Sequence, residues 1–205
     1  MPLHVLSAPA PASRSVLAAL RSPAAVHRGG KPSATDAADA AGRSLEIELP
    51  LPVHELTGSG SSGAGWKTRL AGWRFLLREA GAAAGSDAVG AAETLLTADG
   101  WAFAYFCGGP YVASSQRALR QAESVPGLHQ PRLLSVPGLY MLTLWLHANT
   151  AADVGEGTPQ RSDVLIPLAP APPGIAAHVP HRAGALLPLL TSRSVPATPL
   201  LSSGA

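Results

Sequence analysis

The stretch from Leu139 to His147 is the sequence feature that most constrains the fold of this chain. Its residues alternate between two apolar sets, and none of them is acidic or basic before the final histidine. Such alternation, with aromatic side chains included, is typical of a β-strand that is covered on most of its surface. The residues from Arg132 onward extend the pattern, but Pro137 removes a backbone donor and Gly138 permits a bulge, so these two residues divide it.

Four further segments show strand patterns around this stretch. In Ser44–Leu51 apolar residues alternate with two glutamates, which predicts a strand with one wet face. Asp99 and Gly100 separate Glu93–Thr97 from Trp101–Phe106 and favour a hairpin turn. The segment Asp163–Leu168 is the next strand pattern after Leu139–His147, so these two are expected to pair in antiparallel fashion. The remaining segments are Glu93–Thr97, Trp101–Phe106 and Asp163–Leu168.

Two helices are expected beside these strands. The first is predicted from apolar residues at helical spacing between Trp66 and Leu77, and Gly81 is expected to end it. The second begins near Ser115 and ends before Pro126. The apolar positions of the first helix are Trp66, Leu70, Trp73 and Leu77.

These elements predict one α+β domain over residues 44–192, with a mostly antiparallel sheet of four to six strands and two or three helices packed on one face. Before Asp36, the segment 1–43 contains four arginine or lysine residues and no acid. They are expected to form a disordered or weakly structured extension, with an organellar transit peptide as the alternative. Residues 193–205 are expected to be a disordered tail. Long irregular termini agree with the 21 glycines and 20 prolines of the chain.

The composition weighs against several classes of protein. A net charge of +2 with 14% charged residues gives no strong field for nucleic acid, so a nucleic-acid partner is not expected. A single cysteine excludes an intramolecular disulfide and the usual cysteine-based zinc site, and it favours a cytoplasmic protein. The longest apolar run is too short to span a bilayer, so no membrane span is predicted. The alanine-rich, arginine-bearing composition resembles that of a GC-rich bacterial reading frame.

Cys107 is the candidate nucleophile of an enzymatic function. It stands at the end of a predicted strand and precedes two glycines, a placement that presents a nucleophile near backbone N–H groups in several hydrolase folds. His147, at the end of the opening strand, is the candidate base, and Asp163 is the residue that would orient it. The three residues predict a cysteine-dependent hydrolase or transferase as one alternative. A cysteine that packs as a small apolar residue is the other explanation of the same position.

The tract from Gly58 to Gly65 gives a third alternative, a nucleotide-binding protein. It contains the spacing Gly-x-Gly-x-x-Gly between a predicted strand and a predicted helix, where glycines let a backbone approach a pyrophosphate. The strand does not run directly into Gly58, however, and a tract of little but glycine and serine is also typical of a flexible loop. No cofactor and no metal is part of the predicted site.

The face of the opening strand that carries Met141, Trp145 and His147 is the candidate surface for a partner protein. It mixes apolar and polar side chains, and the predicted helices do not account for it. Because no catalytic pattern outweighs its structural explanation, we expect a non-enzymatic protein-interaction or assembly module. The sequence names neither the partner nor the oligomeric state.

Overall fold

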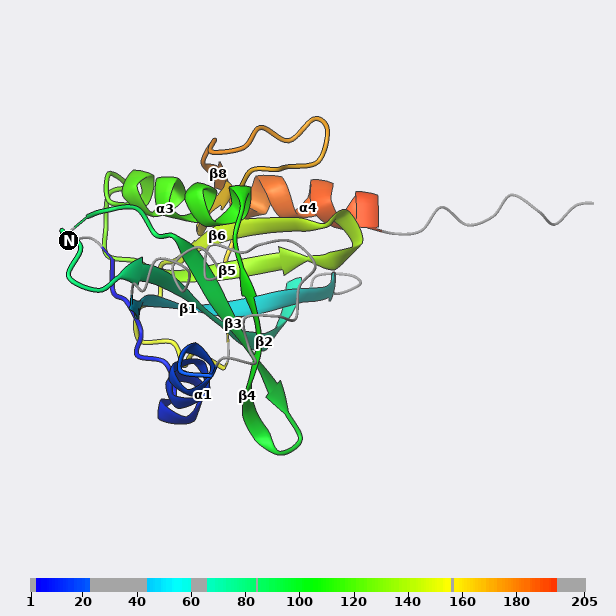
Figure 1. The fold of residues 1–205 in the computed structure, drawn as a ribbon. Coiled ribbons are helices and arrows are strands. Elements are labelled where there is room, and N and C mark those ends of the chain that lie inside the picture. Colours follow the sequence, from blue (N-terminus) through cyan, green and yellow to red (C-terminus); the bar gives the residue numbers. More distant parts are fainter. Residues whose placement is uncertain (1–2, 23–43, 60–65, 84, 156, 195–205) are drawn as a thin grey trace, which may run out of the picture.

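The computed structural model of this chain is built on one sheet of eight strands, in the order β4-β3-β2-β1-β5-β6-β7-β8 (Figure 1). The structure describes residues 3–22, 44–59, 66–83, 85–155 and 157–194. Most of the predicted tail and most of the glycine-serine tract therefore lie outside the described residues, while Arg193 and Ser194 of that tail belong to the last helix. The strands are β1 (Leu45–Ser59), β2 (Trp66–Glu79), β3 (Gly90–Thr97), β4 (Gly100–Cys107), β5 (Gln130–Val136), β6 (Met141–His147), β7 (Val164–Pro167) and β8 (His181–Arg182).

Three α-helices accompany the sheet in the described part of the chain, which confirms the predicted α+β class with a mostly antiparallel sheet. They are α1 (Ala10–Leu20), α3 (Pro110–Ala122) and α4 (Ala183–Ser194), and a short 3-10 helix, η1 (Pro137–Leu139), divides β5 from β6 as the Pro-Gly pair predicted. The helix α1 lies within the segment assigned to an N-terminal extension. It packs on the sheet with Ala12 and Val16 fully buried, so at least this part of the segment belongs to the fold.

The sheet consists of two antiparallel halves that meet at one parallel junction. The strands β1 to β4 form the first half, β5 to β8 form the second, and β1 pairs with β5 in parallel. Only Val53–Glu55 and Leu133–Ser135 take part in that pairing. A parallel connection needs a crossover, and α3 supplies it between β4 and β5.

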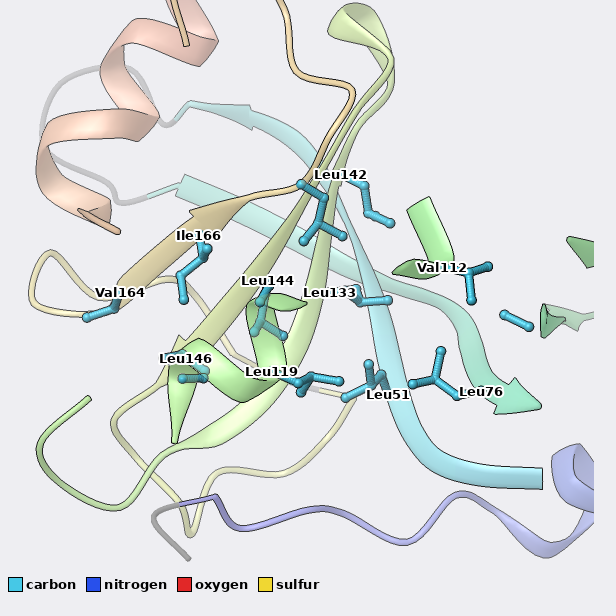
Figure 2. Close-up of a cluster of buried hydrophobic side chains, with 14 residues drawn as sticks. Leu51, Leu76, Val112, Leu119, Leu133, Leu142, Leu144, Leu146, Val164 and Ile166 are labelled. Carbon is cyan, nitrogen blue, oxygen red and sulfur yellow. The ribbon is translucent and has the colours of Figure 1, made fainter. Parts of the chain in front are cut away.

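The helix α3 covers one face of the sheet and seals the largest apolar cluster (Figure 2). Leucines at alternate positions of β6 point to this face, and Leu51 and Leu76 reach it from the first half. Because both halves contribute to the cluster, the core is shared across the parallel junction. Its buried members are Leu51, Leu76, Ala91, Val112, Ala118, Leu119, Ala122, Leu133, Leu142, Leu144, Leu146, Val164, Ile166 and Leu168.

The helices α1 and α4 cover the opposite face at its two ends. Trp73 and Phe75 pack with α1, while Met141 and Trp145 pack with α4. Figure 1 shows α1 and α3 on opposite sides of the sheet. The helices thus cover both faces of the sheet. Every residue of β6 is buried for this reason, since successive side chains of a strand point to opposite faces.

The predicted helix between Trp66 and Leu77 is wrong: these residues form β2, which pairs with β1 along most of its length. The helical spacing of the tryptophans and leucines coincides with a strand in which Trp73–Leu77 is buried on both faces. Residues Trp66–Leu70 alternate apolar or polar with basic side chains, and that alternation is the strand signal in the sequence. Gly81 stands in the turn after β2 with a φ of 75° rather than at a helix end.

Candidate functional site

His147 and Asp163, two of the predicted catalytic residues, are in contact. His147 ends β6 and Asp163 precedes β7, so the antiparallel register of these strands brings the residues opposite each other. The distance from His147 Nδ1 to Asp163 Oδ2 is 2.8 Å. Both side chains are buried, with exposed fractions of 2% and 0%. Because the carboxylate accepts, Nδ1 of His147 is the nitrogen that donates.

Asp163 is the acceptor for a set of buried donors around the start of β7. Its carboxylate accepts hydrogen bonds from Trp145 Nε1 at 2.8 Å and from the backbone N–H groups of Ala148 and Gln160. Burial alone raises a carboxyl pKa, but the bonds from His147, Trp145 and the two backbone groups outweigh it and lower the pKa of Asp163. Asp163 is therefore a carboxylate that fixes both ends of the loop between β6 and β7.

Cys107 is not brought to this pair. It ends β4, and four strands lie between β4 and β6 in the sheet. The thiol lies beside Arg74 and Glu93, and burial raises its pKa to about 11. A thiol with that pKa is almost wholly protonated at neutral pH, so the position does not supply an activated nucleophile.

Met141, Trp145 and His147, the predicted partner surface, are buried in this fold. Their exposed fractions are 2%, 0% and 2%. Met141 and Trp145 pack against Leu186, Leu187 and other apolar residues of α4. The strand face that was predicted to bind a partner is thus covered by α4 of the same chain. A partner could reach this face only if α4 moved away.

A second buried polar group, which sequence reasoning missed, adjoins this pair. Arg132 of β5 and His54 of β1 are both fully buried, and Arg132 Nη1 lies 3.3 Å from His54 Nε2. The Arg132 guanidinium also lies 5.1 Å from the ring centroid of Trp145, within the range of a cation–π contact. Its Nε donates to Gln130 Oε1 at 2.6 Å. Burial lowers the pKa of Arg132 to about 10. Burial also lowers the pKa of His54 to about 3, and the nearby Arg132 and His147 contribute to this shift.

These buried polar groups hold the long loop between β6 and β7 against the sheet. Arg132 Nη2 donates to the Asp153 carbonyl at 2.9 Å, and Gln130 Nε2 donates to the Ala152 carbonyl at 3.2 Å. From the other side, Thr68 Oγ1 donates to the Gly157 carbonyl. Backbone groups of a loop need such partners when they are removed from water. The polar cluster is therefore accounted for as a loop anchor.

A serine and a histidine meet at a second place, on the other face of the sheet. Ser114 Oγ of α3 lies 3.1 Å from His178 Nε2 and accepts the Ala169 N–H at 2.7 Å. Gln121 Nε2 donates to the His178 carbonyl. His178 has a φ of 61°, which a non-glycine residue rarely adopts. Ser114 is 5% exposed, so the contacts serve to fasten the loop between β7 and β8 to α3.

The glycine-serine tract connects two strands rather than a strand and a helix. Gly58 and Ser59 end β1, and Trp66 begins β2 directly beyond the residues that the structure does not describe. Gly58 is paired opposite Lys67 in the antiparallel ladder. A phosphate held on a helix N-terminus needs a helix after the loop, and β2 stands in that place.

Large apolar side chains are exposed on both faces of the hairpin of β3 and β4, because Leu95 and Leu96 are successive residues of β3. Leu95, Leu96 and Tyr105 have exposed fractions of 47%, 53% and 51%; we refer to these three residues as the hairpin surface. The turn at Asp99 and Gly100 forms as predicted, and it extends beyond the neighbouring strands (Figure 1). β4 is also the last strand of the sheet, and no strand of the described chain pairs with its outer edge.

Comparisons with protein-family models, curated proteins and solved structures found no match to this chain. Within residues 3–22, 44–59, 66–83, 85–155 and 157–194, no three His, Cys, Asp or Glu side chains are grouped as a metal ion would require. Over the same ranges, no helix combines the length and apolar character needed to cross a membrane.

Proposed function

We propose that this chain is a protein-interaction or assembly module that binds its partner through the hairpin surface. The observation that supports this is the exposure of Leu95, Leu96 and Tyr105 on this hairpin, whose outer strand β4 pairs with no second strand among the described residues. Exposed apolar side chains that gather in one place are typical of interaction sites. An open edge strand offers unpaired backbone N–H and C=O groups to an added strand.

The two enzymatic alternatives have less support. A hydrolase or transferase based on Cys107 needs a thiolate near a base, whereas burial raises the pKa of this thiol to about 11 and four strands of the sheet lie between β4 and the strand of His147. A nucleotide-binding protein needs a helix after Gly65, where β2 begins. An interaction module needs neither arrangement. We place the module in the cytoplasm, where a chain with one unpaired cysteine remains reduced.

Photo-crosslinking in cells tests this function. A photo-reactive amino acid replaces Leu96, and in a separate variant it replaces Leu189 of α4, which is exposed to a similar fraction of 56%. We expect a discrete adduct with a protein after irradiation of the Leu96 variant, because this side chain would lie inside the interface. The Leu189 variant should give none. If Leu96 gives no adduct, or if both positions give the same products, the hairpin surface is not the binding site.

A further inference from the structure

We draw no further inference here: the strongest candidate, the outer edge of β4 on the hairpin surface, belongs to the site already proposed to bind a partner, and nothing in the described part of the chain shows what covers it.

Discussion

His54 is a histidine that the fold holds in its neutral form. It is fully buried in β1, its ring stands edge-on to Trp145 with 5.4 Å between centroids, and its Nε2 faces the Arg132 guanidinium. Burial, then Arg132 and then His147 lower its pKa from 6.5 to about 3. An extra proton at this position would stand in an apolar core beside a cation.

This burial predicts a pH dependence of stability. Between pH 6.5 and about 3 the unfolded chain binds a proton at His54 that the folded protein does not bind. The free energy of unfolding should therefore fall as pH drops through this window, by up to about 1.4 kcal/mol per pH unit from this residue. Urea unfolding at pH 6, 5 and 4 measures the slope, which His54→Gln should reduce. His181→Gln, which leaves His54 in place, should keep it, and equal slopes in all three proteins would contradict the assignment.

Residues at the ends of strands could be predicted as neighbours, whereas residues that meet across the fold could not. His147 and Asp163 flank two consecutive strands, so their proximity follows from a hairpin alone. His54 and Arg132 are 78 positions apart and meet only because β1 pairs in parallel with β5. No local sequence pattern predicts the parallel pairing of β1 with β5. The sequence signal for it is weak, since it consists of one histidine in β1 and one arginine in β5.

At the scale of elements, α1 is the clearest addition to what the sequence predicted. It lies before the expected domain, yet Ala12 and Val16 are fully buried in a cluster with side chains of β2 and β3, and the helix also contacts β4. Its apolar residues are mostly alanines, so the amphipathic pattern is faint, and a proline at its start is compatible with either a helix or a loop. Packing on Trp73 and Phe75, rather than helix propensity, accounts for its stability.

Val16→Ala tests whether α1 is an integral part of the fold. Removing two buried methyl groups should lower the free energy of unfolding by about 1 to 3 kcal/mol, through lost contacts and the cavity that remains. Arg14→Ala, at an exposed position of the same helix, should change it by less than about 0.5 kcal/mol. Both values come from urea unfolding at one pH. A Val16→Ala protein as stable as the unmodified chain would show that α1 is only loosely attached.

Strands were predicted correctly where apolar residues alternate with a two-residue spacing. They were missed where the same apolar residues also fit the spacing of a helix. Trp101–Phe106 and most of Leu139–His147 were identified because they alternate without interruption. The strand β6 begins only at Met141, because Leu139 belongs to η1 and Tyr140 follows it in a left-handed conformation. In β2 the residues Trp73–Leu77 are buried on both faces, so the sequence shows an apolar run instead of an alternation. Arg74 adds to the ambiguity, because a basic residue suggests a solvent-facing position. Its pairing with Glu93 of β3, which makes its burial tolerable, is visible only in the sheet.

At the scale of the whole molecule, we expect the two halves of the sheet to unfold as one cooperative unit. Their backbones join only through three residues of β1 and three of β5. The side chains join far more extensively, since the cluster under α3 takes Leu51 and Leu76 from one half and Leu144 and Ile166 from the other (Figure 2). Neither half can bury this cluster alone, so each depends on the other for its core.

Single-tryptophan variants test this cooperativity. Trp73 reports on the first half and Trp145 on the second, and each can be kept while the other three tryptophans are replaced by phenylalanine. Within each variant, the urea midpoint from fluorescence should coincide with the midpoint from far-UV circular dichroism, as for a two-state transition. Fluorescence of Trp73 that changes well before or after the circular dichroism would indicate halves that unfold separately.

The parallel junction also sets an order of events during protein synthesis. β1 finds its antiparallel partner β2 soon after both are made, but β5 begins 71 residues after β1 ends. At about 5 to 20 residues per second, the ribosome needs several seconds to supply β5. During that interval the first half has an open edge at β1 and an uncovered apolar face. The nascent chain therefore passes through a stage in which it is most exposed to aggregation and best suited to recognition by a chaperone.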